Sequence, residues 1–313
     1  MFQPKEKIEW IIPVYNEEAC LPELFNRLLA IREKMRLVDT SFIFINDGSS
    51  DWSQVFLERI ASENRFVKVI AFSRNFGHQA ALSAGLDAAN ADYVVVIDAD
   101  LQDPPELVEE MFKKAKEGFD IVYGKRLTRD GESWFKRITA SMFYKFLNKM
   151  CDVDIPADTG DFRLLNRNVL IALKQMHEKH RFIRGMIAWT GFKSVPFFYK
   201  RTKRHAGQTK YTLKKMVNFA LDAIFSFSVT PLRAATYIGV VILEFGFLGA
   251  LFLLYLRFFT PFTVPGITAV LVTVIMLGGV QIIMLGVIGE YLGRVFEEAK
   301  NRPLYIVRER INL

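Results

Sequence analysis

The chain has 313 residues, of which 51% are hydrophobic and 13% aromatic, and its formal net charge is +7. This composition excludes disordered and collagen-like classes and is sufficient for a sizeable buried core. The two cysteines, Cys20 and Cys151, lack CxxC spacing, so neither a disulfide scaffold nor a cysteine zinc site is indicated. Basic residues gather on both sides of an apolar stretch and no nucleic-acid-binding fingerprint occurs. We therefore expect contact with anionic lipid and no nucleic-acid partner.

The first 124 residues alternate between short apolar runs and segments with helical periodicity. The runs are rich in β-branched residues and cover 8–14, 41–45, 67–72, 93–98 and 120–124. Segments around 18–36, 51–64, 77–90 and 104–118 carry spaced apolar residues after acidic, Asp-Pro or Gly-polar starts. This alternation predicts an α/β domain with a mostly parallel sheet and crossover helices. The chain contains neither GxGxxG nor GxxxxGKS, so a dinucleotide-binding fold or a P-loop is not indicated.

Polar residues follow each of the first four predicted strands. They are Tyr15-Asn16-Glu17, Asn46-Asp47-Gly48, Ser73-Arg74-Asn75 and Asp98-Ala99-Asp100. Ligands of open α/β sheets bind beyond the carboxyl ends of the strands, so these ends define the candidate site.

The acids after the fourth strand suggest a metal site. Asp98 and Asp100 stand two residues apart and Gln102 follows, which gives a group of hard oxygen ligands suited to Mg²⁺ or Mn²⁺. Such an ion would hold a diphosphate. Asp103 precedes two prolines and is expected to cap the next helix.

The first two strand ends allow two interpretations. Tyr15 has the ring to stack on a nucleobase, and Asp47 can accept a hydrogen bond from a base or a ribose. Turn and cap formation explains the segment from Asn46 to Asp51 about equally well.

The second half of the chain is expected to lie at and in a membrane. Basic amphipathic helices are predicted at 134–150 and 212–229, and for the first an ordinary core-packing helix is an equal alternative. Apolar runs at about 234–256 and 263–289 each reach the ~20 residues that a spanning helix needs. Glu244 in the first run is expected to pair with another helix or to mark function. Lys and Arg concentrate on both flanks, so both are predicted to be cytoplasmic.

Together with Ser73-Arg74-Asn75-Phe76-Gly77-His78-Gln79, these motifs resemble those of family-2 glycosyltransferases with the GT-A fold, which is Rossmann-like. More narrowly, nearly the whole chain is similar to the polyisoprenyl-phosphate glycosyltransferases, the group that includes dolichol-phosphate-mannose synthase and bactoprenol glucosyltransferases. The resemblance divides the chain into a GT-A domain at 1–211, a juxtamembrane helix at 212–232, two membrane helices within 233–290 and a cytoplasmic tail at 291–313. Asn46 stands where the family usually has Asp, which leaves a charge-based role at that position in doubt.

The resemblance also implies roles for individual residues. It places the nucleotide sugar against Pro13, Tyr15, Glu17, Asp47, Asp98 and Lys210, and the metal against Asp98, Asp100 and Gln102. It implies that the lipid phosphate is held by Arg126, Arg137 and Arg204, and that the chemistry involves Asp100, Asp158 and Asp161. Residues 201–210 resemble a basic loop that closes over the phosphates, whereas His78 and His205 are interpreted as structural or headgroup contacts.

The implied reaction is an inverting transfer of a hexose, with glucose from UDP-glucose as the leading donor, onto undecaprenyl phosphate. It implies Mg²⁺ or Mn²⁺, an integral protein of the bacterial inner membrane with both termini cytoplasmic, and a homo-oligomer, possibly a tetramer. Alternatives are another donor (UDP-GlcNAc, a UDP-4-amino-arabinose derivative or GDP-mannose) and a non-catalytic membrane scaffold that senses nucleotide sugars. A processive polysaccharide synthase is disfavoured because no QxxRW-like motif occurs.

Overall fold

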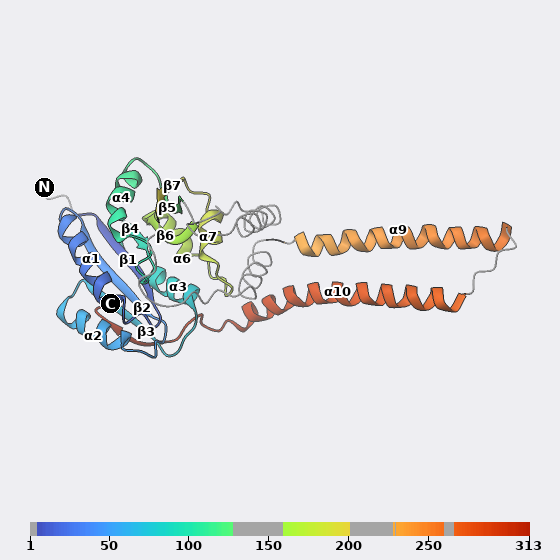
Figure 1. Cartoon of the computed structure of the whole chain (residues 1–313), viewed down its shortest axis with the longest axis horizontal. Helices are drawn as coiled ribbons and strands as arrows, with labels where there is room; N and C mark the ends of the chain where they lie inside the picture. The colour runs from blue at the N-terminus through green and yellow to red at the C-terminus, as the bar shows by residue number, and fades with distance from the viewer. Residues whose placement is uncertain (1–4, 128–158, 201–227, 229, 260–265) are drawn as a thin grey trace.

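The computed structural model describes residues 5–127, 159–200, 228, 230–259 and 266–313. The described residues form an α/β domain, from which two long helices extend side by side (Figure 1). The amphipathic helices predicted at 134–150 and 212–229 lie outside the described residues, apart from Ser228.

One sheet of eight strands organises the domain, in the order β7-β5-β6-β4-β1-β2-β3-β8. β1 pairs in parallel with both β2 and β4, and β2 pairs in parallel with β3, which confirms the predicted parallel sheet. β6 runs antiparallel between β4 and β5, and β5 pairs in parallel with β7. The strands are β1 Lys7–Val14, β2 Asp39–Asn46, β3 Val67–Phe72, β4 Tyr93–Val96, β5 Ile121–Arg126, β6 Thr159–Asn166, β7 Ser194–Tyr199 and β8 Val307–Ile311.

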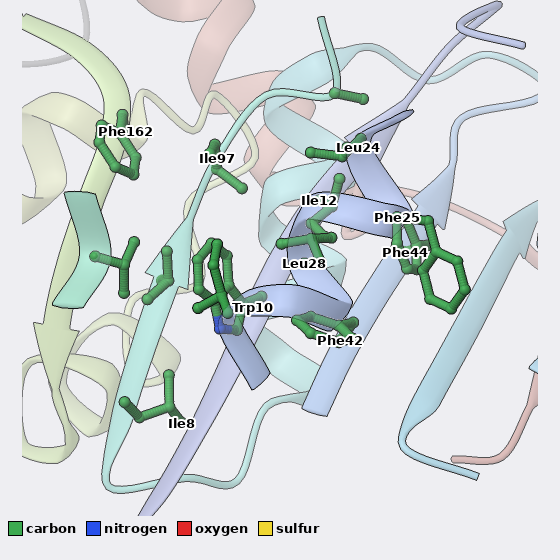
Figure 2. Packing of buried hydrophobic residues seen from close by; sticks show 14 of the residues in the cluster. Ile8, Trp10, Ile12, Leu24, Phe25, Leu28, Phe42, Phe44, Ile97 and Phe162 are labelled. Carbon is green, nitrogen blue, oxygen red and sulfur yellow. The ribbon is translucent and has the colours of Figure 1, made fainter. Parts of the chain in front are cut away.

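Helices cover both faces of the sheet because successive side chains of a strand point to opposite faces. From β1, Trp10 and Ile12 pack with α1, α2 and α4, whereas Ile11 packs with α3, α6 and α7 on the other face. Figure 2 shows the first of these layers, in which the Trp10 and Phe42 rings meet edge to face at 6.0 Å. The helices are α1 Leu21–Lys34, α2 Ser53–Glu63, α3 His78–Ala88, the 3₁₀ turn η1 Pro105–Leu107, α4 Val108–Lys116, α6 Arg167–Lys174, α7 Ile183–Trp189, α9 Thr230–Phe259 and α10 Gly266–Lys300.

The strand order reverses at β1. The chain places β2 and β3 on one side of β1 and then crosses to place β4 on the other side. The carboxyl ends of β1 and β4 therefore form a topological switch point, which is the usual ligand position in such a sheet. Tyr15 follows β1 at this point, and Asp98 follows β4.

The C-terminal segment, predicted as a tail at 291–313, contains the edge strand β8, which pairs antiparallel with β3. The Tyr305 ring stacks on Phe72 with centroids 4.9 Å apart, and the Asn312 amide donates to the carbonyls of Ala61 and Val67 at 2.8 Å each. β8 is not predicted by the sequence, because VRERI is short and mostly charged, as exposed edge strands often are. β1 and β8 thus belong to the same sheet, at opposite ends of the chain.

The two predicted apolar helices are present as α9 and α10. The described residues contain two candidate membrane spans by length and composition, Thr230–Leu256 and Thr273–Lys300, and neither is buried within the chain. The Tyr291 hydroxyl donates to the Ser228 carbonyl at 2.7 Å, and the Met284 side chain lies close to Gly239, so the helices run antiparallel in contact. Glu244 lies exposed on α9.

The close approach of α3 to the sheet depends on Gly85. A Cβ atom added there would lie 2.3 Å from the Ile11 side chain and 2.9 Å from that of Ile45. Gly85→Ala should therefore lower the stability of the protein by about 1–3 kcal/mol, because overpacking outweighs the gain in helix propensity. Thermal unfolding of the full-length protein in detergent measures this loss.

Ile11→Ala provides the control for this clash. By itself it should destabilise the protein, because it leaves a cavity. Combined with Gly85→Ala it removes the clashing group, so the double variant should lose less stability than the sum of the two single variants. Additive losses would contradict the close contact.

Candidate functional site

The loops after β1 and β2 are tied together by hydrogen bonds. The Asn16 side chain accepts from the backbone N–H of Ser50 at 2.8 Å, and its own backbone N–H donates to the Ser49 hydroxyl at 3.1 Å. The backbone N–H of Glu17 donates to the Ser53 hydroxyl at 3.1 Å. Asn16 adopts a φ of 56°, which asparagine tolerates better than most residues. Between these two loops Tyr15 is 48% exposed, so its ring is accessible for stacking. Pro13 is buried.

Asp47 holds the loop that follows β3. Its buried carboxylate accepts from the backbone N–H groups of Phe76 at 2.7 Å and Gly77 at 3.0 Å, and from the Asn75 amide at 2.9 Å. Burial raises the pKa of Asp47, although the two backbone N–H groups counteract part of this effect. These contacts support the turn-forming interpretation of Asp47, and its contact with a nucleotide stays a prediction.

Gly48 allows the β2 and β3 loops to approach each other. Its φ is +66°, and a Cβ atom would lie 2.4 Å from the carbonyl carbon of Arg74. Only glycine fits this position without displacing the backbone of the neighbouring loop.

A cluster of two carboxylates, a histidine and two arginines lies next to these loops, with Nη2 of the buried Arg163 3.9 Å from Asp161. Nε2 of His78, at the start of α3, is 3.1 Å from Asp161 on β6 and 3.6 Å from Asp98 after β4. Arg184 on α7 donates both Nε and Nη2 to Asp161, at 2.7 and 2.9 Å. Residues from four elements distant in sequence thus lie close together. The carboxylate of Asp161 is at their centre and is buried, since Asp161 is only 4% exposed.

The charges in this cluster shift one another. Burial acts to raise the pKa of Asp161, but Arg184 and His78 outweigh it and hold that pKa well below its usual range. Burial acts to lower the pKa of His78, yet its bond to Asp161 and the charge of Asp98 raise it to about 9. Burial raises the pKa of Asp98 to about 6, against the opposing charge of His78. At neutral pH His78 is therefore a cation between two carboxylates.

The predicted metal ligands Asp98 and Asp100 lie where β4 ends. Oδ1 of Asp98 is buried and has no hydrogen-bond partner among the described residues, whereas Asp100 is mostly buried and accepts from the backbone N–H of Gln102 at 3.1 Å. An orphaned carboxylate oxygen beside a second acid suits a hard cation, so these residues fit Mg²⁺ or Mn²⁺.

A second grouping of possible ligands is less suited to a metal. Ligand atoms of His78, Asp98 and Asp161 lie within 4.8 Å of one another. However, both oxygens of Asp161 already accept from Arg184, whereas Oδ1 of Asp98 has no hydrogen-bond partner among the described residues. We therefore favour the predicted set of Asp98, Asp100 and Gln102.

Arg126 at the end of β5 forms a separate polar contact region. Its Nε is buried without a hydrogen-bond partner among the described residues, and its Nη2 lies against Gly160, where a Cβ atom would be only 2.8 Å away. The Tyr199 hydroxyl donates to Asp103 at 2.5 Å. Asp103 was expected to cap a helix, and this expectation is wrong: the 3₁₀ turn begins after Pro104 without a side-chain cap. Asp103 instead accepts a hydrogen bond from Tyr199, the last residue of β7.

The structure brings together some of the predicted site residues and leaves others undescribed. Asp47, Asp98, Asp100, Asp161 and Arg126 all lie at the strand ends on one edge of the sheet. The remaining candidates Asp158, Arg137, Arg204 and Lys210 lie outside the described residues.

Two participants were not predicted from the sequence. His78 was part of a recognised motif but was interpreted as structural, and Arg184 belongs to no motif that we recognised. A signal for His78 was available, because a histidine at a helix start beside strand-end acids has charged partners within reach. No comparable signal existed for Arg184, since its proximity to Asp161 arises only when α7 packs beside α3.

Comparisons with known proteins establish the family of this chain. The profile described as "Glycosyl transferase family 2" matches residues 9–174. The chain belongs to glycosyltransferase family 2. It is 47% identical to an uncharacterized glycosyltransferase of Bacillus subtilis (strain 168), with 96% of this chain and 92% of that protein covered. It is 39% identical to the bactoprenol glucosyl transferase of Shigella phage SfII, with 97% and 98% covered. The mostly parallel sheet of this family-2 member is the expected GT-A sheet.

The charge state of His78 gives a pH-dependent contribution to stability. Because folding raises its pKa from 6.5 to about 9, the contribution is fully present below 6.5 and is lost as pH rises through about 9. The stability of the wild type relative to His78→Gln should therefore be larger at pH 6.5 than at pH 9. Thermal unfolding in the presence of EDTA at both pH values tests this, and a difference that does not change with pH would contradict the charged state.

Proposed function

We propose that this glycosyltransferase transfers glucose from UDP-glucose onto a polyisoprenyl phosphate, with undecaprenyl phosphate as the acceptor in a bacterial membrane. The observation that carries the proposal is a pair of unsatisfied charged groups at one sheet edge. Asp98 has an orphaned carboxylate oxygen suited to a cation that carries the donor diphosphate, and Arg126 has an orphaned buried Nε suited to a phosphate. Similarity over nearly the full length to proteins named bactoprenol glucosyl transferases supports this choice of substrates.

The proposed chemistry is a single displacement. An oxygen of the lipid phosphate attacks the anomeric carbon of glucose, the bond from that carbon to UDP breaks, and the configuration inverts. The phosphate is already anionic near neutral pH, so the reaction needs no general base. Asp98, Asp100 and Gln102 would hold Mg²⁺ or Mn²⁺, which supplies charge stabilisation to the departing diphosphate. Tyr15 would stack on the uracil ring, with Pro13, Glu17, Asp47 and, from outside the described residues, Lys210 around the nucleotide.

The acceptor would be bound on the membrane side. Arg126 is proposed to hold the lipid phosphate together with Arg137 and Arg204, which lie outside the described residues. Because both oxygens of Asp161 accept from Arg184, orientation of the reactants falls to Asp158 rather than to Asp161. Asp161 would then contribute indirectly, through its contacts with His78 and Arg184.

We also propose an integral protein of the bacterial inner membrane, with α9 and α10 as its spans and both termini cytoplasmic. Pairing of the C-terminal β8 in the same sheet as β1 supports this topology, because the two ends of the chain then lie on the same side of a bilayer. A homo-oligomer, possibly a tetramer, is part of the proposal. An added Cβ at Gly246, Gly249 or Gly278 meets nothing within 4 Å among the described residues, which leaves room for close approach of another helix.

Reconstitution of the full-length protein tests the function. Incubation in liposomes with Mn²⁺, undecaprenyl phosphate and UDP-glucose should give a lipid-linked hexose that mass spectrometry detects, together with free UDP. The same assay with UDP-GlcNAc or GDP-mannose should give little product. A larger product yield from either of these donors would refute the glucose assignment, and no product from any donor would favour a non-catalytic scaffold.

Asp100→Asn serves as the active-site variant in this assay. Loss of one carboxylate charge at the diphosphate should reduce turnover on the order of 100-fold. Asp92→Asn is the matched control, because Asp92 precedes the opposite end of the same strand and is partly exposed. It should retain nearly full turnover.

Arg126 provides a prediction for the acceptor. Arg126→Ala should raise the KM for undecaprenyl phosphate or lower kcat by about 10-fold or more, while UDP binding measured without lipid stays unchanged. Arg126→Lys should remain impaired, because lysine keeps the charge but loses the planar bidentate donor.

Arg167→Ala controls for a general loss of positive charge, since Arg167 pairs with Asp92 on the surface at 3.6 Å. Wild-type kinetics in Arg126→Lys, or weaker UDP binding in Arg126→Ala, would withdraw the acceptor assignment.

A further inference from the structure

A hydrogen bond from the first residue of α7 to a side chain of α3 ties the two helices together. The Gln79 side-chain carbonyl accepts from the backbone N–H of Ile183 at 3.0 Å, at the first residue of α7. The next residue is Arg184. Gln79 and His78 are adjacent at the start of α3, so the same helix end fixes both the base of Arg184 and the imidazole of His78.

Arg184 fixes both the position and the plane of the Asp161 carboxylate. Its fork contributes two hydrogen bonds, at 2.7 and 2.9 Å, one to each oxygen of Asp161. A bidentate pair of this kind sets the plane of the carboxylate as well as its distance. The Arg184 side chain is 24% exposed and the Asp161 side chain 6%, so solvent competes little at the acid.

Asp161 in turn directs His78 towards the end of β4. An ionised carboxylate only accepts hydrogen bonds, so the His78 Nε2 at 3.1 Å must carry a proton. The same Nε2 lies 3.6 Å from the orphaned Oδ1 of Asp98. The imidazole therefore lies between the two acids. Its charge attracts the Asp98 oxygen, so the position of the imidazole influences the orientation of the Asp98 carboxylate.

We propose that Arg184 is a positioning residue of the donor site, which acts through Asp161 and His78 to fix the Asp98 carboxylate for a metal-bound nucleoside diphosphate. This inference rests on the proposed function, because it takes the donor diphosphate to be carried by a cation at Asp98. Its two hydrogen bonds to Asp161 are the contacts through which it would act. Its effect is to keep one buried acid fully paired, so that Asp98 remains available for the cation.

Removal of Arg184 has a defined consequence. Asp161 then loses its bidentate partner and competes with Asp98 for the Nε2–H of His78. The imidazole is drawn towards Asp161, and the Asp98 oxygen loses the group that orients it. Residues that orient metal ligands in this way typically change metal affinity or activity by 10–100-fold when they are replaced.

The test is the gain in UDP affinity that Mn²⁺ produces. UDP binding to the full-length protein in detergent is measured calorimetrically with Mn²⁺ and again with EDTA. In Arg184→Gln, the gain from Mn²⁺ should fall by about 10-fold or more, whereas UDP affinity in EDTA should equal that of the wild type. Arg184→Lys should recover only part of the gain, because it restores the charge without the fork.

Asp161→Asn tests whether the effect runs through the carboxylate. It should reproduce the loss, and the double variant Asp161→Asn with Arg184→Gln should be no worse than either single variant, because both break the same chain of contacts. In turnover, kcat should fall in each variant while the KM for undecaprenyl phosphate stays constant.

Arg181→Gln is the matched control for lost stability. Arg181 is also largely buried and also faces α3, where it lies 3.7 Å from Asp87 and donates to the Met176 carbonyl at 2.9 Å. Its replacement should lower the melting temperature but leave the Mn²⁺-dependent gain intact. This separates a positioning effect from a general loosening of α7.

Several outcomes overturn the inference. They are an unchanged Mn²⁺ gain in Arg184→Gln, an equal loss in Arg181→Gln, or a wild-type UDP affinity that does not respond to Mn²⁺. Tighter Mn²⁺ binding without UDP in Arg184→Gln would show that His78, Asp98 and Asp161 form a metal site instead. Failure of the proposed function can be told apart from failure of this inference. If no donor gives a lipid-linked product, the proposed function fails, but the effect of Mn²⁺ on UDP affinity can still be measured in each variant.

Discussion

Parallel pairing of β1 with both β2 and β4 is the constraint on which the site depends. Parallel strands need crossover connections, and the loops that follow β1, β2, β3 and β4 therefore all emerge at the same edge of the sheet. The reversal of strand order at β1 makes the ends of β1 and β4 the usual ligand position. Residues as distant in sequence as Tyr15 and Asp98 come to the same edge by this register alone.

Charge balance shapes that edge once the strands are in place. Two acids, Asp47 and Asp161, are buried, and Asp98 is partly exposed with one buried carboxylate oxygen. The three carboxylates differ in their hydrogen-bond partners. Asp47 uses backbone N–H groups of the β3 loop, and Asp161 uses the fork of Arg184 together with His78. Asp98 keeps an oxygen without such a partner among the described residues, which is why it is the proposed site of a cation.

The C-terminal strand joins the apolar helices to this domain. After α10 the chain returns to pair β8 with β3, and the Ser73 backbone N–H donates to the Ile306 carbonyl at 3.0 Å. Lys179 and His180 also contact α10, at Glu298 and Glu297. The α10 helix is thus fastened to the domain near the loop that leads to His78. Such contacts hold α10 against the domain.

The sequence by itself determined the parallel α/β sheet, its strand-end acids and the two long apolar helices, because short apolar runs, helical periodicity and span length are local properties. It also determined Asp98 and Asp100 as candidate ligands. Only the tertiary structure decided that Asp161 is held by Arg184, that Asp103 braces Tyr199 rather than capping a helix, and that the last residues form β8. Those contacts join residues more than 20 positions apart, and their partners are chosen by packing and burial, which no local pattern encodes.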